Sequence, residues 1–135
     1  MAMSAADLEA LAGRIREALE SADLDAYSEL LHPAVRWGAP GDDAPPCRNR
    51  NDVLAWYRQG RAEGRRARVT EVITFADKDK IVVGMKVTSG RKRPNAGEID
   101  RWQVLTIVDG TMADISGYER RQEALAAAGW QEPDG

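Results

Sequence analysis

With 135 residues and a formal net charge of −3 at pH 7, the chain forms one domain, residues 1–135, that can bury roughly 68% of the surface exposed by its unfolded state. The chain has a single cysteine, Cys47, so it forms no internal disulfide, and the spacing between Cys47 and the single histidine, His32, matches no metal site. It also contains no run of about 20 apolar residues that could span a membrane. The acidic balance argues against nucleic-acid binding, so we expect a cytoplasmic protein that uses no metal and no cofactor.

The first half of the chain has the pattern of three helices. Apolar residues recur at helical spacing over residues 8–19, and Ser4 is placed to cap the first turn. A second, shorter helix starts at Leu24 and ends at His32, because the residue before a proline is disfavoured in the α region. Asn51 is the expected cap of a third helix over residues 52–60.

The second half has the pattern of a sheet. A short strand is expected at residues 35–37, followed by strands at 68–75, 80–88, 99–108 and 112–118 and a short C-terminal helix that ends at Gly129. Asp109-Gly110 favours a tight hairpin turn, and residues 89–97 form another hairpin loop. This order predicts an α+β fold in which a cone-shaped, curved antiparallel sheet wraps around the three N-terminal helices and leaves a cavity open at one end.

Alternation along the strand over residues 99–108 divides its side chains between two faces. One face carries Glu98, Asp100, Trp102, Val104 and Thr106, and the other carries Ile99, Arg101, Gln103, Leu105 and Ile107. We assign the first face to the cavity, because a carboxylate and an indole share it. The second face has no helix in this scheme, so Leu105 and Ile107 are expected to form a homodimer interface.

Large side chains are the best candidates for a pocket wall. The predicted ligand-binding residues are Tyr27, Trp37, Trp56, Tyr57, Met85, Asp100 and Trp102. This many rings suit a small, largely apolar, cyclic ligand, although they would equally form an ordinary core. In such a wall burial would keep Asp100 neutral and make it the catalytic acid or base, whereas a strand-edge aspartate would pair with an arginine.

Arginines gather in two groups of the sequence, Arg58 to Arg68 and Arg91 to Arg93. No aromatic residues interleave with the second group, and the net charge of the chain is negative. We therefore interpret these arginines as a solvated surface and not as a phosphate-binding stripe.

Several segments carry a family resemblance. They are Ala22-Asp23-Leu24-Asp25-Ala26, Leu30-Leu31-His32-Pro33-Ala34-Val35, Asn51-Asp52-Val53-Leu54-Ala55-Trp56-Tyr57, and Val108-Asp109-Gly110 with Tyr118 and the helix after it. In this order they resemble the SnoaL-like (polyketide cyclase-like) branch of the nuclear transport factor 2-like superfamily. The resemblance implies a fold that hosts isomerases, cyclases, dehydratases, epoxide hydrolases and binding proteins, so the fold does not choose the function.

The catalytic residues implied by this resemblance are incomplete here. Asp100 is similar in place to the protonated acid of the ketosteroid isomerase branch, but the position of the carboxylate base falls at Gly38 or Ala39. In the Asp-Arg-Asp group of the limonene-epoxide hydrolase branch, Glu98 stands in place of the arginine and Gly117 in place of the second aspartate. The resemblance therefore leaves three hypotheses: cofactor-independent proton transfer by Asp100, non-catalytic binding of a small molecule, and a structural dimerisation module.

Overall fold

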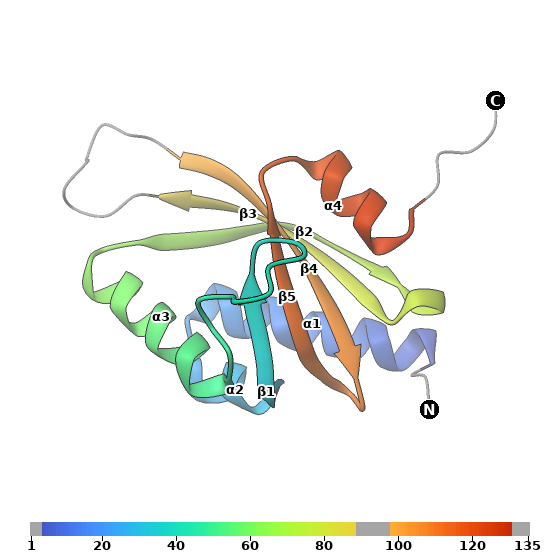
Figure 1. Cartoon of the computed structure of the whole chain (residues 1–135), viewed down its shortest axis with the longest axis horizontal. Coiled ribbons are helices and arrows are strands. Elements are labelled where there is room, and N and C mark those ends of the chain that lie inside the picture. The colour runs from blue at the N-terminus through green and yellow to red at the C-terminus, as the bar shows by residue number, and fades with distance from the viewer. Residues whose placement is uncertain (1–3, 89–97, 131–135) are drawn as a thin grey trace.

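The computed structural model describes residues 4–88 and 98–130 and confirms the α+β fold (Figure 1). Its elements are α1 (Ala5–Ser21), α2 (Leu24–Glu29), β1 (Leu31–Gly38), α3 (Arg50–Ala62), β2 (Arg66–Phe75), β3 (Lys80–Thr88), β4 (Glu98–Val108), β5 (Thr111–Tyr118) and α4 (Arg121–Ala128). The predicted hairpin loop over residues 89–97, with Arg91, Lys92 and Arg93, lies outside the described residues.

The strands form one curved sheet in the order β1-β5-β4-β3-β2. Neighbouring strands pair antiparallel from β5 to β2, as predicted, whereas β1 pairs parallel with β5. The parallel pair arises because the two strands are far apart in the chain, so no hairpin constrains their relative direction.

Helices cover both faces of this sheet (Figure 1). We call the face toward α1, α2 and α3 the inner face and the face toward α4 the outer face. The larger core lies on the inner face and includes Leu8, Ile15, Tyr27, Val53, Ile81 and Leu105. A smaller core lies beneath α4 and consists of Val82, Val104, Ala124, Leu125 and Ala128.

Two local signals in the sequence act as predicted. The Ser4 side chain accepts a hydrogen bond from the Asp7 amide at 3.1 Å and caps α1. Asp109 and Gly110 have φ angles of 52° and 78°, which are the positive values that a tight two-residue hairpin turn requires. These features depend only on neighbouring residues, so their positions follow from the sequence.

The boundaries of α2 and α3 differ from the prediction. Asn49, not Asn51, caps α3, because its side chain accepts the Asp52 amide at 2.9 Å. The second helix ends at Glu29, and His32 lies within β1, where its Nδ1 accepts the Ala34 amide at 3.0 Å. Pairing with β5 therefore extends β1 backwards into residues that local preference assigned to a helix end.

The predicted assignment of the two faces of β4 is wrong. Leu105 and Ile107 are buried in the larger core on the inner face, whereas Val104 packs beneath α4. Leu105 and Ile107 therefore cannot form the predicted dimer interface, and a homodimer remains a prediction without an assigned surface. Alternation shows which side chains share a face, but the path of the helices decides which face they cover.

The outer face depends on a glycine opposite a tryptophan. Gly84 in β3 pairs with Trp102 in β4, and the indole lies against the glycine backbone. A Cβ atom at residue 84 would overlap with ring carbons of Trp102. The Arg121 guanidinium carbon lies over the same ring, 6.0 Å from its centroid. The missing side chain of Gly84 therefore makes room for the indole between the sheet and α4.

We expect Gly84→Ala to lower the free energy of unfolding by about 1–3 kcal/mol, because the added methyl group displaces the Trp102 ring. Urea unfolding followed by circular dichroism measures this change. Gly117→Ala in β5 is the matched control, since no atom lies within 4 Å of its added Cβ. Equal urea midpoints for the two variants would show that the indole moves aside without loss of stability.

Candidate functional site

A cavity of about 680 Å³ lies at the end of the molecule where β2 and β4 begin and β3 ends. This volume is within the range of roughly 300–1,000 Å³ that small-molecule pockets occupy. Residues from α1, α2, β1, α3 and from strands β2 to β5 line it. Because α1, α2 and α3 contribute to its lining, the cavity lies mainly on the inner face, whereas the prediction from the sequence assigned it to the opposite face of β4.

The structure brings most of the predicted pocket residues together. Those that line the cavity are Tyr27, Trp37, Trp56, Tyr57, Met85 and Trp102. Trp102 is among the lining residues although its ring packs against Gly84 on the outer face. The predicted position of Asp100 is wrong: its side chain is 64% exposed and lies 3.2 Å from the Lys86 ammonium group.

Asp100 lies outside the cavity because the two faces of β4 are the reverse of the predicted assignment. Asp100 shares the outer face with Trp102 and pairs directly across the ladder with Lys86. From the sequence, the other interpretation of Asp100 was an aspartate at the strand edge that pairs with an arginine. The structure shows a half-exposed ion pair of this kind, with lysine as the partner. Asp100 therefore has no geometric basis for a catalytic role in the cavity.

An aromatic cluster forms one wall of the cavity. The Trp37 ring stacks on Tyr57 at a centroid distance of 5.2 Å and contacts Trp56 edge-on at 6.0 Å. Tyr27 contacts Tyr57 edge-on at 5.3 Å. These distances and angles are those that aromatic pairs prefer, so the rings support one another and form a rigid apolar surface.

Local structure holds these rings in place. The loop after β1 folds back so that Trp37 exchanges two backbone hydrogen bonds with Cys47, of 3.0 and 3.3 Å. Asp23 caps α2 by accepting the Ala26 amide at 3.1 Å, and this positions Tyr27 on the buried side of a short helix. Helix α3 supplies Trp56 and Tyr57, and Trp56 is 46% exposed.

Three buried polar groups lie at the deep end of the cavity. They are the hydroxyl groups of Tyr27 and Tyr57 and the side-chain oxygen of Gln103, which lie close enough together to affect the pKa values of the two tyrosines but form no well-directed hydrogen bond within residues 4–88 and 98–130. A buried polar atom without a partner costs about 1–3 kcal/mol. The protein therefore keeps a polar group at this place despite an energetic cost.

Burial perturbs the tyrosines of this cluster. Burial raises the pKa of Tyr27 well above its ordinary value, and the nearby Tyr57 hydroxyl adds to the rise. Burial also raises the pKa of Tyr57, although the proximity of Tyr27 and Gln103 partly opposes the rise. Both hydroxyl groups are therefore neutral at physiological pH and retain protons that they can donate.

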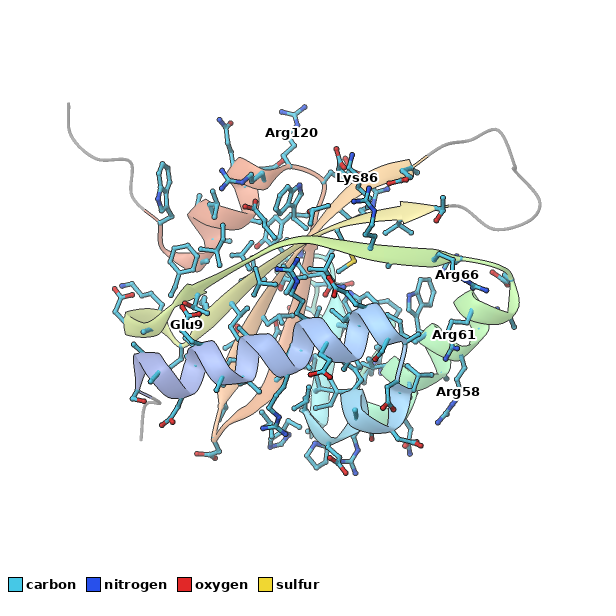
Figure 2. The ribbon with its side chains drawn as sticks, turned by 180° about the vertical axis from the view of Figure 1, so that it is seen from behind. Glu9, Arg58, Arg61, Arg66, Lys86 and Arg120 are labelled. Atoms are coloured by element: carbon cyan, nitrogen blue, oxygen red, sulfur yellow. The ribbon has the colours of Figure 1, made fainter. Side chains whose placement is uncertain are left out.

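The mouth of the cavity is rich in arginine. Arg61, Arg65, Arg66 and Arg101 line it, together with the acidic residues Glu20 and Glu119. Figure 2 shows Arg61 and Arg66 at the same end of the molecule, where α3 leads into β2. The Arg65 guanidinium carbon lies 5.3 Å from the Trp56 ring centroid, so a cationic side chain borders the aromatic wall.

Three cavity residues of β4 were not predicted from the sequence: Ile99, Arg101 and Gln103. All three belong to the face that was assigned to a dimer interface. The available signal was the apolar alternation of the neighbouring strand, because Ile81 pairs with Leu105 and Val83 with Gln103. The fully buried Ile81 and Val83 identify the inner face more reliably than a single aspartate beside a tryptophan.

Two further findings concern residues 4–88 and 98–130 only. No group of three or more His, Cys, Asp or Glu side chains is arranged there to hold a metal ion. No helix in these ranges is long and apolar enough to cross a membrane.

Comparison with known proteins identifies a family and several similar folds. The family model of the SnoaL-like domain matches residues 12–115. A candidate ketosteroid isomerase from Kribbella flavida DSM 17836 superposes with a TM-score of 0.67 at 17% identity, over 96% of this chain and 84% of that chain. Bal32a, from a soil-derived mobile gene cassette, gives a TM-score of 0.71 at 18% identity, over 89% and 94%.

A candidate polyketide cyclase from Sinorhizobium meliloti gives a TM-score of 0.63 at 24% identity, over 86% of this chain and 100% of that chain. No curated protein matches the chain at a significant level. At such low identities the similar structures establish the fold alone.

The tyrosines provide a direct test of the burial at this site. The chain has three of them, and burial also raises the pKa of Tyr118, with a further rise from the nearby carboxylates of Asp114 and Glu123. We expect the absorbance of tyrosinate at 295 nm to show no midpoint near 10 in the native protein, whereas the protein in guanidinium chloride should titrate there.

The same shifts predict how stability depends on pH. Because the folded pKa values exceed the unfolded ones, the native state holds these protons more tightly. The contribution of these tyrosines to the free energy of unfolding is therefore complete below about pH 10, and it is lost as the pH rises through their folded pKa values. If the tyrosinate absorbance of the native protein has its midpoint near pH 10, the aromatic cluster is open to water.

Proposed function

Because the chain belongs to the SnoaL-like domain family, we propose that it binds a small, largely apolar, cyclic molecule in the cavity and releases it unchanged. The observation that carries this proposal is the aromatic wall of a cavity of about 680 Å³. A rigid wall of stacked rings offers apolar contact at a small cost in side-chain entropy.

A polar atom of the ligand is proposed to lie at the deep end. There the ligand oxygen accepts a hydrogen bond from the Tyr57 hydroxyl, near Tyr27 and Gln103. Such a bond would satisfy a group that otherwise has no partner within the described residues, so it favours a ketone or an alcohol over a pure hydrocarbon.

Binding without conversion is favoured by the placement of the carboxylates. Among the described residues that line the cavity, the acids are Glu20 and Glu119. The Glu20 carboxylate accepts a hydrogen bond from Arg16 Nε at 3.1 Å, and Glu119 is exposed just beyond β5. Proton transfer at a ligand carbon requires a base within hydrogen-bond reach of that carbon's proton, and the deep end presents hydroxyl and amide groups instead.

Proton-transfer chemistry remains the second candidate, since Tyr57 could polarise a ligand carbonyl. Two similar structures are named as a candidate ketosteroid isomerase and a candidate polyketide cyclase, and these names point to isomerisation and cyclisation. The third hypothesis, a structural module with a filled core, predicts no response to any ligand.

We expect 2-decalone, a bicyclic ketone, to change the tryptophan emission in a saturable manner, because three of the four tryptophans line the cavity. Tyr57→Phe should weaken its binding by roughly 2- to 10-fold through loss of one hydrogen bond. The hydrocarbon decalin should bind equally to both proteins, and Asp100→Asn on the outer face should leave both affinities unchanged.

Proton NMR of the ketone after long incubation separates the remaining hypotheses. Recovery of unchanged 2-decalone, without exchange of its α-protons into deuterated water, supports binding alone. Exchange that is faster than in buffer and slower in Tyr57→Phe would establish proton transfer. An emission spectrum that no cyclic compound alters would establish a filled core and overturn the proposal.

A further inference from the structure

The charge at the mouth of the cavity opposes the charge of the whole chain. The chain carries a net charge of −3, yet the cavity is lined by four arginines and two glutamates. Glu20 is already paired with Arg16, which lies outside the lining. The mouth is therefore a local cationic surface on an acidic protein.

The donors of these arginines are directed mainly to backbone carbonyl groups. Arg61 donates to the Ala22 carbonyl at 3.0 Å, Arg66 to the Arg65 carbonyl at 3.0 Å, and Arg101 to the Asp100 carbonyl at 3.2 Å. Each guanidinium group has five donors, so these bonds orient the side chains and leave donors available.

Several cations elsewhere in the fold are paired with carboxylates. Arg68 lies 3.2 Å from Glu98, Lys86 lies 3.2 Å from Asp100, and Arg121 binds Glu71. Within the described residues, the cavity arginines have one such contact, a long distance of 3.8 Å between Arg65 and Glu63. Arg61, Arg66 and Arg101 thus have no carboxylate partner within the described residues, a property that they share with Arg36 and Lys80 outside the cavity.

The two ends of the cavity therefore differ in chemistry. Arg101 lies on the inner face of β4, directly across the ladder from the buried Met85 and two residues from the half-exposed Ile99. Trp37, Trp56 and Tyr57 line the same cavity, and the Arg65 guanidinium carbon lies 5.3 Å from the Trp56 ring centroid. A molecule that fits both regions has an apolar cyclic body and an anionic group at one end.

We propose that the ligand is a cyclic carboxylic acid whose carboxylate lies at the mouth of the cavity, held by Arg101 with Arg61 and Arg66 beside it. This inference rests on the proposed binding function and specifies its ligand class. The planar guanidinium fork matches a carboxylate in geometry as well as in charge, which a lysine would not do equally well.

Three decalin derivatives with the same skeleton test the proposal: the 2-carboxylate, the neutral 2-carboxamide and the cationic 2-ammonium compound. We expect the carboxylate to bind about tenfold more tightly than the carboxamide, since each exposed ion pair contributes up to about fivefold and several arginines contribute. The ammonium compound should bind most weakly. The preference for the carboxylate should decrease as salt is raised from low to high concentration.

Two variants test whether Arg101 holds the carboxylate of the ligand. Arg101→Gln should weaken binding of the carboxylate by about fivefold and leave that of the carboxamide unchanged. Arg58→Gln is the matched control, because Arg58 is an exposed arginine of α3 that does not line the cavity (Figure 2). Circular dichroism of both variants checks that the fold is retained.

The outcomes separate this inference from the proposed function. Equal affinities for the carboxylate and the carboxamide would overturn the anionic ligand while leaving the binding function intact. Equal losses in Arg101→Gln and Arg58→Gln would show a general charge effect and overturn the site. If none of the three compounds binds, and 2-decalone and decalin do not bind either, the proposed function itself fails.

Discussion

The burial of one face of the sheet beneath α1, α2 and α3 is the constraint on which the rest of the structure depends. Ile81, Val83 and Leu105 point into this layer and are completely buried. Because successive strand residues alternate between faces, their burial also places Gln103 and Arg101 on the inner face and Asp100 and Trp102 on the outer face. The chemistry of the cavity is therefore a consequence of packing elsewhere in the same strands.

A second layer on the outer face makes this arrangement possible. Helix α4 covers Val82 and Val104, so the sheet is apolar on both faces in its middle and does not need a partner subunit there. Beyond α4 the outer face carries ion pairs such as Lys86 with Asp100. Trp102 lies at the boundary and fits there because Gly84 has no side chain.

The cavity combines three chemical environments. Neutral hydroxyl groups lie at its deep end, aromatic rings form its wall, and arginines surround its mouth. Burial keeps the tyrosine protons in place, whereas exposure keeps the guanidinium groups solvated and only moderately attractive. Contact with the rings therefore provides most of the proposed affinity, and the polar ends provide orientation and selectivity.

Local chemistry in the sequence determined the order of the helices and strands, the Ser4 cap and the Asp109-Gly110 turn. The start of β1 instead depended on its pairing with the distant β5. Local chemistry also identified the large rings of the cavity wall, since rings of this size are buried in most folds. The side on which β4 presents Asp100 was not determined in this way. Alternation is symmetric between the two faces of a strand, and only the tertiary path of α1 and α4 breaks that symmetry.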